Sequence, residues 1–321
     1  MKKYFKPMLI LTLLLSCALY SVINPIFGSV GDSLSIEVVP DSLRSHVERL
    51  ANTDKPRTYD NIKALNAAAA YIKQQFEEHS EYVREQSYKV DYREYRNIIC
   101  SFGPTDGERI IIGAHYDVCM DQPGADDNAS GVAGILEIAR LLKSEAPHLK
   151  YRIDLVAYTL EEPPYFRTEY MGSAVHARYL HDKGITVKAM ICLEMIGYFT
   201  DEEKSQEYPI GLLKLFYPTK GNFIAIVGQL GKGGLTRKIK RGMRAGAAID
   251  VRSINAPRFV PGIDYSDHLN YWKYKYDAVM ITNTSWYRNA NYHMGTDTPE
   301  TLDYDRMAEV VKGVYQAVVN L

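Results

Sequence analysis

The stretch "RIIIGAHYDVCMDQPGADDNASGVAGILEIARLL", residues 109–142, holds a strand pattern, an acidic turn and a helix pattern in direct succession. Its β-branched run at 109–114 does not alternate with polar residues, which is typical of a strand buried on both faces of a sheet. From Ser130 onward, apolar residues recur at helical spacing. Between the two patterns lie His115 and four aspartates. The stretch therefore predicts a strand–turn–helix unit whose turn is rich in groups that bind metal ions.

The same alternation of strand and helix patterns continues along the chain. Apolar runs of strand length recur at 152–159, 188–193, 223–228 and 277–282, with helical patterns at 172–184 and 304–321. Upstream, residues 61–79 have helical spacing and residues 80–100 alternate like a hairpin. This order predicts an α/β fold, a three-layer α/β/α sandwich with a mostly parallel, mixed central sheet. No long linker divides residues 40–321, so we expect one domain there.

The overall charge of the chain is balanced, which disfavours nucleic-acid binding. Lys and Arg number 38 against 39 Asp and Glu, so composition predicts no nucleic-acid partner. The most basic run, "LTRKIKRGMR" at 235–244, is expected to be the exposed face of a helix.

The first residues predict export. A basic start, "MKKYFK", precedes a run from Pro7 to Phe27 that has no charged residue. Residues 1–28 are thus expected to be a signal peptide or an N-terminal membrane anchor, with lipidation at Cys17 as a third alternative. Basic residues before the run predict a cytoplasmic N-terminus and a domain outside: periplasmic, extracellular or membrane-anchored.

The other cysteines, Cys100, Cys119 and Cys192, match no zinc-knuckle or redox spacing. One pair would be able to form in an oxidising compartment. Buried, reduced thiols are the simpler expectation.

Acidic and histidine residues follow four of the predicted strands. His115 follows the run at 109–114, Glu161 and Glu162 follow 152–159, Glu194 follows 188–193, and a longer segment after 277–282 leads to His293. Each alone has a structural explanation, such as a core histidine or a solvated strand end. Together they predict a metal site, because ligands bind beyond the carboxyl ends of strands in open α/β sheets. Histidine nitrogen with carboxylate oxygen suits zinc, and the acidic turn lacks the ligand pattern of a calcium loop.

Six motifs occur in the order and spacing of a known family: "GAHYD", "PGADDNASGVAGILEIARLL", "LEEPPYF" with "MGSAVHA", "LEMIGYF", "YSDHLNYW" and "YHMGTDTPETLDY". Over residues 40–321 the chain resembles the zinc aminopeptidase family that includes bacterial leucyl-type aminopeptidases, glutamate carboxypeptidase and glutaminyl cyclases. The resemblance implies two zinc ions per chain. His115 and Glu194 would bind one ion, Glu162 and His293 the other, and Asp127 would bridge them.

The resemblance also implies roles for neighbouring residues. Glu161 matches the general base, and Asp117 would accept the second ring proton of His115. Tyr292 and Tyr265 are candidates, by position, for the donor that stabilises the oxyanion. Asp126 and Asn128 are expected to be turn and cap residues. Asp267 and His268 lie in the "SDH" element expected near the site.

The activity implied is an exopeptidase, most plainly an aminopeptidase acting on peptides through a metal-bridged water. The alternatives are a glutaminyl-cyclase-like aminoacyltransferase, a carboxypeptidase of the same fold, and a binding module without catalysis. All five ligand positions are intact, which argues against the binding module. The chain departs from the family in two places: Glu194 stands where many members have aspartate, and "PPYFRTEYMGS" is longer than usual. That segment is expected to place Tyr165 and Phe166 over the pocket.

Overall fold

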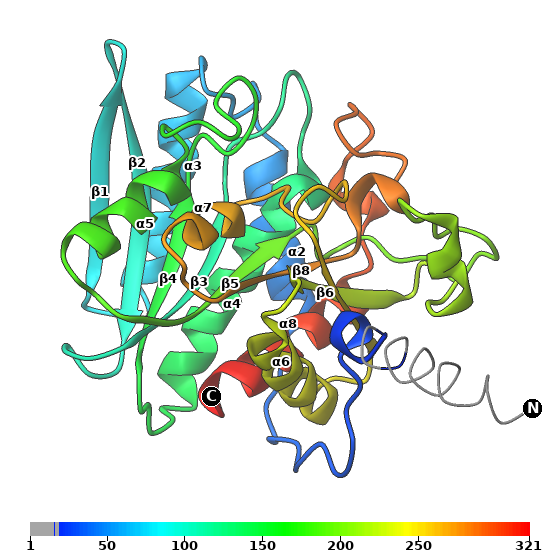
Figure 1. Cartoon of the computed structure of the whole chain (residues 1–321). Helices are drawn as coiled ribbons and strands as arrows, with labels where there is room; N and C mark the ends of the chain where they lie inside the picture. The colour runs from blue at the N-terminus through cyan, green and yellow to red at the C-terminus, as the bar shows by residue number, and fades with distance from the viewer. Residues whose placement is uncertain (1–15, 17–18) are drawn as a thin grey trace, which may run out of the picture.

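A mixed sheet of eight strands forms the centre of the molecule, shown as a computed structural model in Figure 1. The structure describes residue 16 and residues 19–321. In this part of the chain the strands lie in the order β1-β2-β4-β3-β5-β8-β6-β7. Their bounds are β1 (Val83–Val90), β2 (Arg93–Phe102), β3 (Arg109–His115), β4 (Arg152–Tyr158), β5 (Val187–Glu194), β6 (Phe223–Gln229), β7 (Asp250–Ala256) and β8 (Ala278–Thr282).

Four parallel neighbours make up the middle of the sheet. β4, β3, β5 and β8 pair in parallel, so their carboxyl ends reach the same edge. β2 joins β4 antiparallel, and β1 forms a hairpin with β2. On the other side β6 runs antiparallel to β8, and β7 runs parallel to β6. The expectation of a mixed, mostly parallel sheet is confirmed.

Helices cover both faces of this sheet (Figure 1). On one side lie α2 (Pro40–Ala51), α3 (Ile62–Glu77), α4 (Gly131–Ser144), α6 (Gly233–Gly246) and α8 (Tyr304–Val319). On the other lie α5 (Gly172–Asp182) and α7 (His268–Lys273). The predicted three-layer α/β/α sandwich is therefore confirmed.

The isoleucines of β3 pack on both faces of the sheet. Ile110 and Ile112 point into the large core beneath α4 and α8, whereas Ile111 points into the smaller core beneath α5 and α7. Side chains alternate between the faces of a strand, so a strand covered on both faces needs apolar residues at every position. This is why the sequence pattern of β3 is a continuous apolar run.

A side-chain cap and a tight turn determine where some of these helices and strands begin and end. The Asp303 side chain accepts a hydrogen bond from the main-chain N–H of Arg306 at 3.0 Å and so caps α8. Between β1 and β2, the pairing of Val90 with Arg93 leaves a two-residue turn, in which Asp91 has a φ of 53°.

β7 was not predicted from the sequence, because its buried positions are partly polar. Val251, Ser253 and Asn255 alternate with more exposed residues. Ser253 donates to the carbonyl of Ile23 at 3.0 Å, so this strand packs against a polar main-chain segment as well as against the apolar core. A search for apolar runs does not find such a strand.

The basic run at 235–244 lies on α6, and its basic side chains Lys238, Arg241 and Arg244 are exposed, as expected, while Arg237 is half-buried. Lys240 is the exception, since it is 7% exposed and donates to the carbonyls of Ile23 and Asn24 at 3.1 and 3.2 Å. Burial lowers the pKa of Lys240 to about 8.

Cys100, Cys119 and Cys192 are buried and free, which confirms the simpler expectation for them. Most of the apolar N-terminal run, including Cys17, lies outside the described residues. Among the helices that the structure does describe, none has the length and apolar character needed to cross a membrane.

Candidate metal centre

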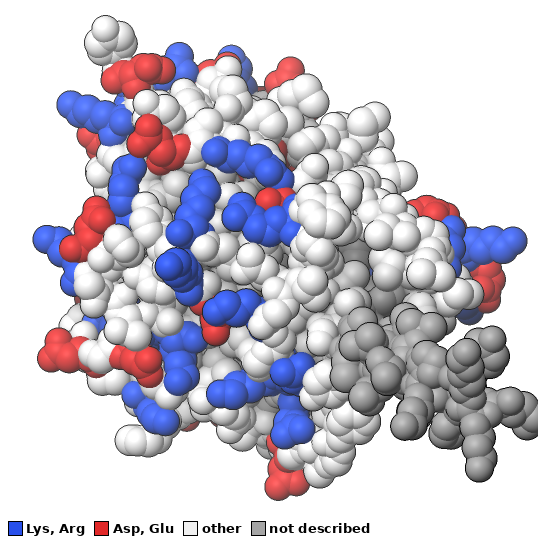
Figure 2. Space-filling view, viewed as in Figure 1, with Lys and Arg blue, Asp and Glu red and all other residues white. Residues whose placement is uncertain are grey.

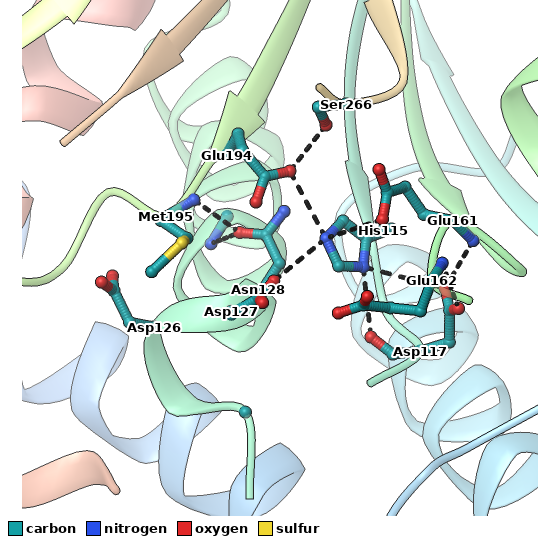
Figure 3. A network of polar contacts seen from close by, with 12 residues as sticks. His115, Asp117, Asp126, Asp127, Asn128, Glu161, Glu162, Glu194, Met195 and Ser266 are labelled. Atoms are coloured by element: carbon teal, nitrogen blue, oxygen red, sulfur yellow. Dashed lines mark hydrogen bonds and ion pairs between the residues drawn. The ribbon is translucent and has the colours of Figure 1, made fainter. Parts of the chain in front are cut away.

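The predicted ligands meet at the carboxyl edge of the parallel strands. His115 and Glu194 are the last residues of β3 and β5. Glu161 and Glu162 follow β4, and His293 lies in the loop region after β8. Figure 3 shows the side chains of His115, Glu194, Asp127 and the glutamate pair converging on one small volume. The topology thus brings together residues that are as far apart in the chain as 115 and 293.

Asp127 stands between two histidines. Its Oδ1 lies 3.3 Å from His115 Nε2, and its Oδ2 lies 3.1 Å from His293 Nε2. Glu194 Oε2 lies 3.4 Å from the same His115 atom, and Glu162 Oε2 lies 3.3 Å from the same His293 atom. Two groups of donors therefore share one carboxylate, which is the arrangement that a bridging ligand between two metal ions requires.

The chemistry of these donors fits divalent metal ions. His115, Asp127 and Glu194 have ligand atoms within 4.8 Å of one another, and all three residues are buried. At the other position, Asp127 Oδ2, Glu162 Oε1 and His293 Nε2 are buried and form no hydrogen bond. Buried polar atoms are nearly always paired, so unpaired atoms that face a common point are what an ion would satisfy.

Electrostatics in the cluster favour a cation. Burial, with the neighbouring Asp127, raises the pKa of Glu162 to about 8. Burial also raises the pKa of Glu161 well above its usual value. Although burial alone would lower it, the carboxylates of Glu194 and Glu161 hold the pKa of His115 well above its usual value. The site therefore concentrates more negative charge than its histidines balance, and divalent cations would offset that charge.

The structure also distinguishes the two aspartates of the turn, which residue type alone does not. Asp126 is saturated by other partners: Oδ1 accepts from the N–H of Gly197 at 2.9 Å, and Oδ2 accepts from the side-chain amides of Asn283 and Asn289 at 2.7 and 2.8 Å. Asp127 is left free to face the histidines. Asn128 accepts from the N–H of Gly131 at 3.1 Å and so acts as a cap at the start of α4, as expected.

Two buried carboxylates hold the ligand pairs by their main chain. Asp117 accepts from the N–H groups of Glu161 and Glu162, each at 3.1 Å. Asp297 accepts from the N–H groups of Asp126 and Asp127 at 2.9 and 3.0 Å. The backbone of each pair is therefore fixed, while the side chains of Glu161, Glu162 and Asp127 remain available. The role of Asp297 was missed from the sequence, although it lies inside a quoted motif, because nothing in the pattern marks it as a main-chain acceptor.

Asp117 thus serves a different purpose from the one expected. The nearest acceptor to His115 Nδ1 is the main-chain carbonyl of Asp117 at 3.1 Å, while its carboxylate Oδ1 lies 3.8 Å away. The residue still orients the histidine, but chiefly through its backbone. A hydrogen bond at Nδ1 leaves Nε2 to face the metal position.

Arg57 is a second residue that sequence analysis missed. It is 1% exposed, and its guanidinium donates to the carbonyls of Tyr116, Pro123 and Gly124 at 2.7–2.8 Å. Burial lowers its pKa to about 10, and the nearby carboxylates of Asp297 and others act in the opposite direction. Arg57 fastens both ends of the loop between His115 and Asp127. It precedes that loop by about sixty residues, and no motif connects them.

The "SDH" element lies near the site, as expected, but its members differ in what they contact. Ser266 donates to Glu194 Oε2 at 2.6 Å (Figure 3). Asp267 is fully buried, and burial raises its pKa to about 7, with His115 acting in the opposite direction. His268 turns away, with Nε2 2.8 Å from the carbonyl of Ile263.

A cavity of about 270 Å³ opens from the ligand cluster. Glu161, Glu162 and Tyr292 are among the residues that line it. Most of its wall is apolar and comes from β6, β8 and the loops at 207–217, 261–265 and 284–287. The face of the sheet beyond α7 is thus left open to a small molecule or a side chain.

Aromatic residues surround this cavity. The Tyr292 ring stacks on the His293 ring, with centroids 3.8 Å apart, and burial raises the pKa of Tyr292 well above its usual value, so its hydroxyl stays protonated as a donor. Phe166 and Tyr265 both line the cavity and contact each other edge-on, so the expectation for Phe166 is confirmed. The expectation for Tyr165 is wrong, because its ring packs against Tyr59 and Tyr95 on the large core.

Comparison with known proteins now decides the family. The model of peptidase family M28 matches residues 97–318. The chain belongs to peptidase family M28. Among its relatives is YfbL of Escherichia coli (strain K12), 47% identical over 289 residues and covering 88% of each chain. Leucine aminopeptidase 1 of Coccidioides posadasii (strain C735) is 26% identical over 225 residues, which are 66% of this chain and 52% of that protein. The chain therefore matches only about half the length of the fungal protein.

Solved structures agree with the M28 fold. LapB from Legionella pneumophila has a TM-score of 0.68 and 22% identity, with 88% of this chain and 72% of that one covered. A glutaminyl cyclase from Bacteroides thetaiotaomicron has a TM-score of 0.66 and 19% identity, with 89% and 99% covered. These two likenesses, both under 25% identity, show that the fold of this chain is shared with LapB and with a glutaminyl cyclase.

Proposed function

We propose that this M28 peptidase is an exopeptidase dependent on two zinc ions, and specifically an aminopeptidase. The arrangement of Asp127 between His115 and His293 is the observation that carries the proposal. Glu194 completes one metal position and Glu162 the other. Zinc suits these nitrogen and oxygen donors, and the relatives named as aminopeptidases support the choice of reaction.

Two zinc ions held by these residues would lower the pKa of a water molecule and polarise the substrate carbonyl. Glu161 is placed to act as the general base. Its Oε2 lies 3.9 Å from His115 Nε2, and it lines the cavity, so its carboxylate meets both the ligand cluster and the substrate space. Glu161 takes a proton from the attacking water and returns it to the leaving amine. Tyr292 donates a hydrogen bond from its hydroxyl to the oxygen that gains charge.

The contacts of Asp117 explain how Glu161 and Glu162 can have separate roles. It holds the main chain of both glutamates, so Glu162 points to His293 while Glu161 points to the cavity. Adjacent residues of the same type thus have separate roles, one as a ligand and the other as a group that must remain free to titrate.

The cavity supports a preference for an apolar N-terminal residue. Val227, Met280 and Ile254 form part of its wall, together with aromatic rings. Pockets for drug-sized ligands measure roughly 300–1,000 Å³, so a cavity of about 270 Å³ suits one large side chain. In Figure 2, which has the view of Figure 1, uncharged residues cover most of the upper right part of the surface, while charged residues gather at its right-hand tip.

A panel of peptides tests the reaction. We expect the zinc-loaded protein to release an N-terminal leucine or phenylalanine from unblocked and C-amidated peptides, and to leave N-acetylated peptides intact. Glycine and glutamate at the first position should react more slowly. Turnover that fails on C-amidated peptides but survives N-acetylation would instead identify a carboxypeptidase.

The glutaminyl cyclase fold neighbours favour one second candidate, an aminoacyltransferase. A peptide that begins with glutamine separates the two activities by mass spectrometry. Loss of ammonia alone identifies cyclisation, whereas loss of the whole residue identifies the aminopeptidase.

We also propose that the protein is exported and that residues 1–28 act as a signal peptide or membrane anchor. The uncharged run that follows the basic start supports this proposal. Peptides are then its partners outside the cytoplasm. Fractionation of cells that produce the full chain tests it: recovery in the cytosol, rather than in the membrane or the exported fraction, would contradict it.

A further inference from the structure

Cys119 lies beside one of the two metal positions. It follows β3 in the loop that Arg57 fastens, is 5% exposed and carries a free thiol. Its sulfur lies within 4.8 Å of a ligand atom of Glu162 and of one of His293. Of the three buried thiols, only Cys119 is grouped in this way with residues able to hold a metal.

A second observation points to a ligand at the same place. Asp127 Oδ2, Glu162 Oε1 and His293 Nε2 are buried without hydrogen bonds, and Glu162 and Asp127 are only 4% and 2% exposed. Among the described residues, the ion-pair partners of Asp127 and Glu162 are the histidines His115 and His293. The nearby Arg57 guanidinium donates to backbone carbonyls instead. In the described part of the chain, therefore, no lysine or arginine side chain pairs with the donors that the thiol faces.

We propose that Cys119 is a further metal ligand, which supplies a thiolate to the position formed by Asp127, Glu162 and His293. The inference rests on the proposed metal centre. On binding, the S–H proton leaves to solvent and a metal–sulfur bond forms, with no change in oxidation state.

A sulfur ligand makes the two positions chemically unequal. With Cys119, one position has four protein donors, which is the number found in closed zinc sites. The other has three, from His115, Asp127 and Glu194, which is the number found in zinc sites that keep a place for water or substrate. Thiolate also favours zinc over harder ions such as manganese and magnesium. The Cys119 position is thus the one that holds its ion more firmly and selects it, while the other is the more open to the substrate.

X-ray absorption of the full-length zinc-loaded protein tests this directly. We expect a zinc–sulfur distance of about 2.3 Å. Because only one of the two zinc ions has the sulfur ligand, the signal averaged over both ions corresponds to half a sulfur per zinc. Cobalt substitution gives a second readout, since a thiolate ligand adds sulfur-to-metal charge-transfer absorption in the near ultraviolet. Cys119→Ser should lose that absorption and release one ion more readily to a chelator. Cys100→Ala, a buried thiol outside the metal groups, is the matched control and should keep both.

Two zinc ions with no sulfur neighbour in the wild-type protein would overturn the inference, and this result needs no variant to fold. An unchanged cobalt spectrum in Cys119→Ser would overturn it as well. Peptide hydrolysis measured on the same samples keeps the proposed function separate: zinc-dependent turnover without a sulfur ligand rejects the role of Cys119 and leaves the aminopeptidase intact.

Discussion

Glu161 and Glu162 are neighbours in the chain, but only Glu162 faces His293, at 3.3 Å. Glu161→Gln keeps the size of the side chain and removes the group that accepts a proton. We expect the turnover number to fall by about 10²–10⁴-fold, the usual contribution of a general base, while zinc content stays the same. Glu169→Gln, with a side chain 70% exposed, serves as the control. Full activity of the Glu161 variant on a leucyl arylamide would exclude this mechanism.

The Asp297 carboxylate holds the turn by accepting from the main-chain N–H groups of Asp126 and Asp127. In Asp297→Asn one of the two acceptors becomes a donor that faces an N–H group, so the turn that carries Asp127 shifts. We expect zinc affinity to fall by about 10–100-fold, as is usual when a supporting contact of a ligand is lost. Competition with a fluorescent chelator measures this affinity.

Asp303→Asn is the matched control, because Asp303 caps α8 and contacts no ligand residue. It should change stability slightly and leave zinc affinity alone. Equal affinities in both variants would mean that the turn does not need its carboxylate clamp.

Residues of the site differ in how far the sequence reveals them. His115 and Glu194 end strands, and ligands of an α/β sheet lie at such ends, so residue type and position suffice to propose them. Asp127 was chosen over Asp126 only through the family resemblance, and the structure explains the choice by the hydrogen bonds that occupy Asp126. Arg57 and Asp297 were not predictable, because their partners are main-chain atoms of a distant loop.

At the scale of elements, α5 and α7 are joined to the sheet by a buried polar chain. His176 Nδ1 on α5 lies 2.7 Å from the Tyr271 hydroxyl on α7, which lies 2.6 Å from the Tyr158 hydroxyl on β4. Burial lowers the pKa of His176 from 6.5 to about 3. Between these two values the unfolded chain binds a proton that the folded protein does not, so the free energy of unfolding falls as the pH falls below 6.5.

We therefore expect this histidine to cost the folded protein about 1.4 kcal/mol per pH unit below 6.5. His176→Gln should flatten this part of the profile, measured by urea unfolding between pH 7.5 and 5. His181→Gln, on the same helix with its side chain 56% exposed, is the control and should leave the slope unchanged. A slope that is the same in His176→Gln and the wild-type protein would show that the histidine is not kept neutral.

Elements were predictable where burial is apolar on both faces, as in β3 and β5, and where helical spacing is regular, as in α4 and α8. β7 was missed because Ser253 and Asn255 occupy its buried positions. The sequence also did not allow us to predict that β6 runs antiparallel to β8, because an apolar run has the same appearance in either direction.

At the scale of the whole molecule, metal ions and folding should be linked. The cluster joins the ends of β3, β4 and β5 to loops from both halves of the chain, and without cations its buried carboxylates repel one another. An ion that binds only the folded state stabilises it by about 2.7 kcal/mol at a concentration 100 times its dissociation constant. We expect a strong chelator to lower the unfolding temperature by several degrees, and added zinc to restore it.

Glu161→Gln should respond like the wild-type protein, because Glu161 holds no ion in the proposed site. Asp127→Asn should respond least, because it loses the carboxylate shared by both positions. If chelation left the unfolding temperature of the wild-type protein unchanged, the cluster would have to be stable as a set of buried charges, and the case for resident metals would fail together with the reaction built on them.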